Sequence, residues 1–228
     1  MTHIFAGAYF CKKLIIVQDP RPIVLYMQSF LHTALLRDSG YFHIWMSAVE
    51  GRSFFDNDQA KAFFITLLQD NLSPRARLQE LSLQPIGFAH AIDLLAFSLT
   101  ERGVHLLIYT KNKKSIEELG QVLLLSYLSY LQGQPGLSKL PFHSLFIFDG
   151  LAGRHEALYV SRDIHLLHED WRGDRYSSIG FYLDDRRGDW MRPYRITTLF
   201  NNNVPRRYVQ LLKSQKTQRD VIFEYLET

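Results

Sequence analysis

The sequence predicts an α+β fold in which an antiparallel central sheet follows the ferredoxin-like order βαββαβ. Between residues 41 and 148, apolar runs of strand length alternate with segments whose apolar residues recur at helical spacing. Two of the strand-like runs, 92–99 and 104–109, are separated only by the polar Thr100-Glu101-Arg102-Gly103. A hairpin therefore joins these two strands directly, as the split βαβ plan requires.

An N-terminal extension precedes this pattern. Residues 4–17 are rich in aromatic and β-branched residues and end at Gln18-Asp19-Pro20, which predicts a strand or a hairpin. Residues 23–36 carry apolar side chains at helical spacing and predict a helix. We expect residues 1–39 to pack on the main domain rather than to build it.

The main domain begins with a strand over residues 41–49, which ends at Glu50-Gly51-Arg52. A helix over 56–68, with acidic residues in its first turn, leads to the hairpin, where Gly103 is available for a positive φ. A helix over 115–131 and a strand over 142–148 complete the order.

Further helices follow the sheet. Over residues 153–168, a helix is predicted to bury Ala157, Val160, Ile164 and Leu167. Tyr159 and Asp163 are four residues apart and would be presented together on another face. Pro205 starts a basic terminal helix, so the expected division is an extension (1–39), a main domain (40–195) and a basic C-terminal helical tail (196–228).

Composition sets broad limits. The 228 residues are 46% hydrophobic, which is ample for a core, and the formal charge of +3 permits a polyanionic partner without demanding one. Cys11 is the only cysteine, so an internal disulfide and a cysteine-rich zinc site are excluded. The sequence contains neither a long uncharged apolar run nor a secretory leader. We therefore expect a cytoplasmic protein that does not span a membrane.

Several motifs, in order, carry a resemblance to a known family. The first strand and turn contain Tyr41-Phe-His-Ile-Trp and Gly51-Arg52, and the hairpin contains Ala96-Phe-Ser-Leu-Thr-Glu-Arg-Gly-Val-His-Leu-Leu. The later helix contains Tyr159-Val-Ser-Arg-Asp-Ile-His-Leu, and a C-terminal signature follows in Tyr176-Ser-Ser, Phe181-Tyr-Leu, Leu199-Phe and Arg206-Arg-Tyr. From about residue 41 to 207 the chain resembles the IS200-like and REP-associated tyrosine transposases of the HUH nuclease superfamily.

The resemblance implies a homodimer that binds single-stranded or hairpin DNA and cleaves it through a 5′-phosphotyrosine. Tyr159 would be the nucleophile, and His105 and Asp163 would hold a divalent cation, Mg²⁺ or Mn²⁺. Two histidines separated by one residue on a strand point to the same face and so reach one ion. Here Gly103 falls where the family has the first of the two, and Glu101 is a further candidate ligand at the turn.

The replacement at Gly103 leaves three functions open. The chain is a transposase with impaired catalysis, a domesticated DNA-binding or regulatory protein without catalysis, or an interaction module whose extension covers the cleft. If only the ligand is missing, Gly103→His should raise cleavage. DNA contacts are expected from Arg172 and Arg175, which lie beside aromatic residues, and from Arg206, Arg207 and Lys213 on the terminal helix.

Overall fold

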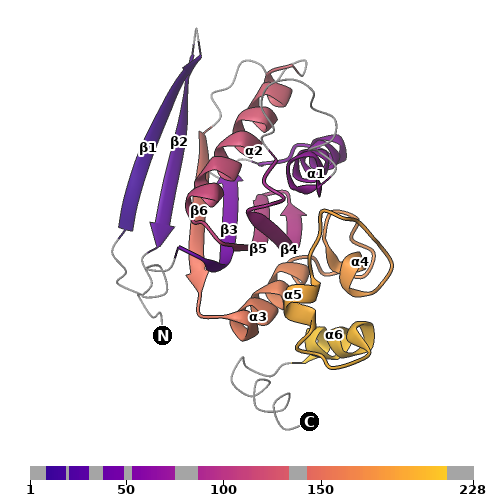
Figure 1. Cartoon of the computed structure of the whole chain (residues 1–228). Helices are drawn as coiled ribbons and strands as arrows, with labels where there is room; N and C mark the ends of the chain where they lie inside the picture. Colours follow the sequence, from indigo (N-terminus) through magenta and orange to yellow (C-terminus); the bar gives the residue numbers. More distant parts are fainter. Residues whose placement is uncertain are drawn as a thin grey trace, which may run out of the picture.

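A computed structural model of the chain describes residues 9–18, 21–30, 38–48, 53–74, 87–133 and 143–214. Its strands are β1 (Tyr9–Gln18), β2 (Arg21–Phe30), β3 (Gly40–Ala48), β4 (Ile92–Thr100), β5 (Gly103–Thr110) and β6 (His143–Leu151). Its helices are α1 (Asp58–Leu72), α2 (Lys114–Gln132), α3 (Arg154–His165), α4 (Ile179–Tyr182), α5 (Tyr194–Thr197) and α6 (Val204–Lys213) (Figure 1).

The strands form one six-stranded sheet in the order β1-β2-β6-β3-β5-β4. Within it, the pairs β6–β3, β3–β5 and β5–β4 are antiparallel, as the sequence predicts. The chain order over this part is β3-α1-β4-β5-α2-β6, so the expected hairpin joins β4 directly to β5. β3 and β5 lie in the middle of the antiparallel part, where a side chain has strand neighbours on both sides.

The N-terminal extension differs from the prediction. β1 and β2 form an antiparallel hairpin, and β2 continues the sheet by pairing parallel with β6, from Val24 opposite His143 to Ser29 opposite Phe148. The extension therefore helps to build the sheet at its edge. The predicted helix over 23–36 is wrong for residues 23–30, and residues 31–36 lie outside the described part of the chain. The apolar residues of this segment fit both the helical and the strand period, and pairing with the distant strand β6 selects the strand.

Helices α1 and α2 cover one face of the sheet (Figure 1). α1 begins where the Asn57 side chain accepts a hydrogen bond from the Ala60 N–H at 2.8 Å. Its buried residues recur every four positions, and burial of each large one contributes about 1.5–3 kcal/mol; they are Ala60, Phe64, Leu68 and Leu72. The alternate side chains of the central strands, including Ile44, Met46 and Leu106, meet these helices in the main core.

The opposite face of the sheet is covered in part by α3, with α4, α5 and α6 packed beyond it (Figure 1). A second core forms there from the strand residues Leu95, Ala96 and Leu107 together with α3, α4 and α6. Toward the C-terminal end of β3, this second face carries an exposed tryptophan, Trp45.

Candidate functional site

The predicted metal ligand His105 lies on the second face of the sheet. Along β5, Val104, Leu106 and Ile108 point into the main core, so His105 and Leu107 point to the other side. Helix α3 packs over this same face, and its Tyr159 belongs to the same core cluster as Leu107. His105 lies on this same face, about 7 Å along the strand from Leu107.

Gly103 is a position where the backbone approaches too closely for a side chain. A Cβ atom at Gly103 would lie 2.1 Å from the carbonyl oxygen of Met46 on the neighbouring strand β3. Gly103 does not have the positive φ that the hairpin was expected to require; among the described residues, the glycine with a positive φ is Gly40. The close approach of β3 therefore explains the glycine at position 103. The turn is held by the Thr100 hydroxyl, which accepts the Gly103 N–H at 3.2 Å. No histidine fits at position 103 without displacement of β3.

A second histidine reaches His105 from the neighbouring strand. His43 Nε2 and His105 Nδ1 are 3.2 Å apart, and the two ring planes differ by 17°. Burial lowers the pKa of His43 to about 4, and burial together with the neighbouring His43 lowers the pKa of His105 to about 4. Both rings are therefore neutral near pH 7, and one donates an N–H to the other.

His43 is a site residue that the sequence reasoning missed. Its signal is the alternation of β3, in which Phe42, Ile44 and Met46 enter the main core and Tyr41, His43 and Trp45 face the other way. The alternation alone does not say which strand lies next to β3. The cross-strand register, with Trp45 opposite His105, supplies that information.

Trp45 extends the histidine pair into a row of three rings, in which Trp45 is exposed and the two histidines are largely covered. Its side chain is 37% exposed, and its ring lies 5.9 Å from that of His105 with planes 16° apart. We call Trp45, His105 and His43 the ring row. On the next strand, Ser98 lies opposite His105 and is fully buried. Within the described part of the chain, its hydroxyl has no hydrogen-bond partner.

Tyr159 and Asp163 are not presented together as predicted. Tyr159 is only 6% exposed and is packed in the second core, whereas the Asp163 side chain is 72% exposed beside Arg162. The expected stripe on this helix is also incomplete, because Leu167 is exposed and Val160 only half-buried. Leu167 is exposed because α3 ends at His165, two residues before it. Tyr159 is buried because α3 is covered on two sides, by the sheet and by α4–α6.

The ligand set implied by the resemblance does not fit a divalent cation in this arrangement. His105 Nδ1 faces His43, Asp163 points to solvent, and Glu101 is exposed at the turn. Among the described residues, no three His, Cys, Asp or Glu side chains are grouped to hold a metal ion. Mg²⁺ and Mn²⁺ prefer several oxygen ligands, and the ring row offers imidazoles only.

The segments that resemble the family's C-terminal signature form a buried polar network. His165 Nδ1 lies 2.6 Å from the Tyr208 hydroxyl, and His165 Nε2 lies 2.7 Å from Ser178 Oγ. The Tyr208 hydroxyl also lies 2.9 Å from Ser161 Oγ, and Ser178 Oγ accepts the backbone N–H of Phe97 on β4. Burial lowers the pKa of His165 to about 3, so the ring is neutral. The network ties α3 to α6 and to the sheet.

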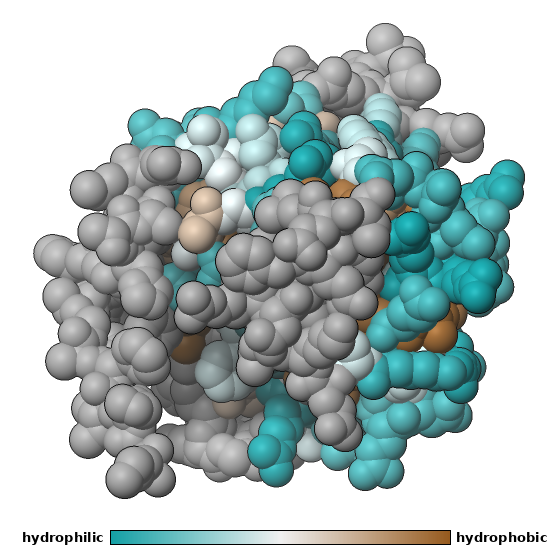
Figure 2. Space-filling view, turned by 90° about the horizontal axis from the view of Figure 1, so that it is seen from below, coloured by the Kyte–Doolittle hydropathy of each residue, from teal (hydrophilic) through white to brown (hydrophobic). Residues whose placement is uncertain are grey.

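The predicted DNA-contacting residues lie outside the ring row. Arg172 and Arg175 are exposed, with guanidinium groups 4.6 Å and 4.8 Å from the ring centroids of Trp171 and Tyr176. Arg175 also forms an ion pair with Asp58 of α1. On α6, Arg206 and Lys213 are exposed and Arg207 is half-buried. From below, the surface on the side of α4–α6 is mainly hydrophilic (Figure 2).

None of the helices in the described ranges is long and apolar enough to cross a lipid bilayer.

Comparison with known proteins assigns no family to this chain. No protein-family model, curated protein or solved structure matches the chain.

Proposed function

We propose that this protein is transposase-like and binds single-stranded or hairpin DNA on the second face of its sheet. The ring row carries the proposal, because its rings come from the two central antiparallel strands and Trp45 is exposed. Unpaired bases stack on aromatic side chains with about 1–3 kcal/mol per base. Neutral histidines extend such a platform without the desolvation cost of a charge.

The topology supports the same proposal. The order β3-α1-β4-β5-α2-β6, with the strands arranged β6-β3-β5-β4, supports assignment to the ferredoxin-like plan. One class of single-strand binding domains presents stacking aromatics on a four-stranded sheet of this kind. The preference for DNA, the homodimer and the cytoplasmic location are proposals that rest on the resemblance and on the single cysteine.

We propose further that metal-dependent cleavage is impaired. Gly103 has no room for a ligand, Asp163 faces solvent, and the proposed nucleophile Tyr159 is buried. The domesticated DNA-binding alternative is thereby favoured over an active transposase. An extension that covers the cleft is less well supported, because β1 and β2 continue the sheet beside β6.

Equilibrium binding tests the proposal. Fluorescence anisotropy of labelled hairpin and single-stranded oligonucleotides is compared for the wild type, Trp45→Ala and Trp45→Phe. Trp45→Ala should weaken binding about tenfold or more, and Trp45→Phe should restore much of it. The matched control is Tyr130→Ala, which removes a half-buried aromatic on α2, on the opposite side of the sheet. Equal affinities of Trp45→Ala and wild type would reject the ring row as the binding surface.

A further inference from the structure

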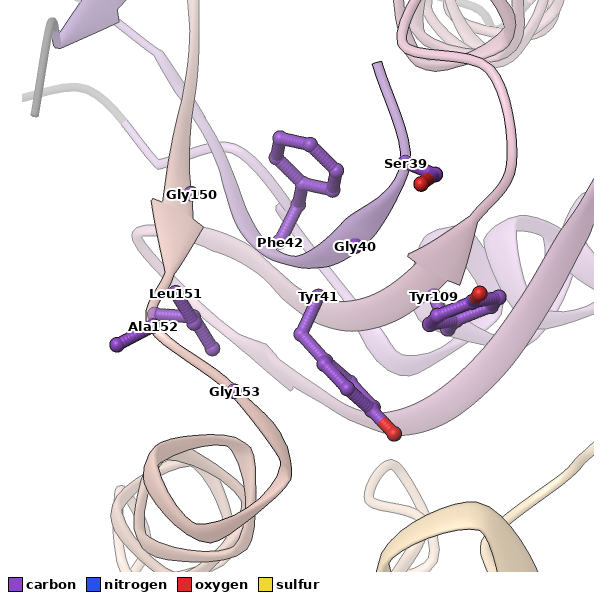
Figure 3. A pocket seen from close by; sticks show the side chains of 9 residues that line it. All are labelled: Ser39, Gly40, Tyr41, Phe42, Tyr109, Gly150, Leu151, Ala152 and Gly153. Carbon is purple, nitrogen blue, oxygen red and sulfur yellow. The ribbon is translucent and has the colours of Figure 1, made fainter. Parts of the chain in front are cut away.

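A hollow of about 230 Å³ lies at the other end of β3, where β5 and β6 end and α3 begins (Figure 3). Tyr41 and Tyr109 contribute aromatic walls, and Gly40 and Gly153 line it without side chains. Tyr41 is on the same face of β3 as His43 and Trp45, because these residues alternate with the core residues of the strand. The hollow thus lies at the strand ends, with Phe42 of the main core on one side and Tyr41, which shares its face with the ring row, on the other.

The walls suit a flat aromatic ligand. The Tyr41 and Tyr109 rings meet edge to face at 5.1 Å, and the Arg195 guanidinium lies 4.0 Å from the Tyr109 ring centroid. An ion pair with Asp93 holds Arg195 in place. Aromatic faces and arginine planes are the surfaces on which unpaired bases stack in single-strand binding proteins.

The chemistry of the mouth favours a neutral ring over a phosphate. The backbone N–H of Ala152, just before α3, already bonds the Glu156 carboxylate, so an anion there would meet a negative charge. A cavity of about 150 Å³ holds benzene, so the larger hollow accommodates a one- or two-ring heterocycle. A Cβ atom added at Gly153 would meet no atom within 4 Å, which shows open space at this wall.

Two arginines lie next to residues that line the hollow: Arg154 follows Gly153 in the chain, and Arg195 packs over the Tyr109 ring. Arg154 starts α3 and bonds the Thr198 hydroxyl at 3.3 Å. Burial raises the pKa of Tyr41, while the positive charges of Arg154 and Arg195 oppose that rise. Both guanidinium groups therefore act electrostatically on Tyr41, one from the first residue of α3 and the other from above the Tyr109 ring.

We infer that this hollow takes one unpaired nucleobase of a strand whose neighbouring bases stack on the ring row. The inference rests on the proposed function and adds to it a base-binding position. Residues 40 and 45 are about 17 Å apart along β3, which several nucleotides of a single strand can span.

An abasic walk along the bound oligonucleotide tests the inference. Each base in turn is removed from the best-bound hairpin, and affinity is measured for the wild type and Gly153→Leu, which places a side chain at the hollow. In the wild type, removal of the base that occupies the hollow should cost about tenfold in affinity, in addition to the losses at bases that stack on the ring row. Gly153→Leu should weaken the intact strand by the same factor and should no longer respond to that position.

The controls separate folding from binding. Gly87→Leu makes the same substitution at another glycine whose Cβ would meet no atom within 4 Å, and it should keep the wild-type profile. If thermal melting shows that Gly153→Leu is unfolded, Tyr41→Ala replaces it and should flatten the profile equally. A wild type that binds the strand but loses affinity at no single position overturns the inference. So does a folded Gly153→Leu with the wild-type profile.

Failure of the proposed function gives a different result. If no strand binds, adenosine, guanosine, cytidine and thymidine are titrated while the amide signals of Gly40 and Gly150, which are present in both proteins, are followed by NMR. Shifts that vanish in Gly153→Leu would keep the hollow as a base site for free nucleosides and reject only its link to a strand. No shifts would reject the base site as well.

Discussion

At the scale of the residue, Gly103 shows why a missing ligand cannot be treated as a simple substitution. The sequence places Gly103 in the hairpin but says nothing of the Met46 carbonyl, which comes from a strand more than fifty residues earlier. His43 was missed for the same reason, since its contact with His105 depends on the register of β3 against β5. Local motifs predicted His105 on a strand, but its neighbours are set by pairing.

Substitution of Gly103 should destabilise the protein rather than restore cleavage. The added Cβ of Gly103→Ala would force β3 and β5 apart, at a cost of about 1–3 kcal/mol or more. Urea unfolding measures the difference, with Gly87→Ala as a control that meets no atom and should change stability little. Equal stability of the two variants would show that position 103 has room, and Gly103→His would again become a fair test of the lost ligand.

Acid should destabilise the protein through its buried histidines. The pKa values of His43, His105 and His165 are lowered from 6.5 to about 4, 4 and 3 by burial. Between pH 6.5 and 4 the unfolded chain binds protons that the folded chain does not, so stability falls as pH falls, by up to about 1.4 kcal/mol per pH unit for each histidine. Urea unfolding at pH 7.5 and 5 should show this loss, and His43→Gln should reduce it. A flat profile would contradict neutral buried rings.

At the scale of the element, the sequence predicted most of the main domain. The helices and strands from residue 40 onward follow local periodicity, and Asn57 and the hairpin residues mark their ends. The exceptions there are α4 and α5, which were not predicted, and α3, whose buried surface depends on α6 from far along the chain. Tyr159 is buried for that reason, which the pattern of α3 alone could not indicate. Before residue 40, the periodicity of β2 is ambiguous.

The polar network should hold α3 and α6 together. Tyr208→Phe removes the hydroxyl that bonds His165 and Ser161 and leaves two buried groups short of a partner, at a cost of about 1–3 kcal/mol. Amide hydrogen exchange of this variant should show less protection of α3 and α6 than in the wild type, while the protection of β3 and β5 should stay the same. Tyr194→Phe, at an exposed tyrosine, is the matched control and should leave exchange unchanged. Unaltered protection in Tyr208→Phe would show that the polar network does not hold α3 and α6 together.

At the scale of the whole molecule, the N-terminal hairpin completes one edge of the sheet. β2 satisfies backbone groups of β6 that would otherwise be open to pairing with another chain. Removal of residues 1–30 should therefore increase self-association beyond the oligomeric state of the full chain. Light scattering after size-exclusion chromatography, over a range of concentrations, measures this. A truncated chain with the mass distribution of the full chain would mean that the edge needs no cover.

The central claim is that the second face of the sheet binds single-stranded DNA without cleaving it. The most direct measurement incubates 5′- and 3′-labelled hairpin DNA with protein and Mn²⁺, and divides each sample between a native and a denaturing gel. Wild type and Tyr159→Phe should shift the DNA on the native gel, Trp45→Ala should need about tenfold more protein for the same shift, and no label should stay on the protein after denaturation. Label that survives denaturation in the wild type but not in Tyr159→Phe would contradict the account, because it would reveal a working nuclease.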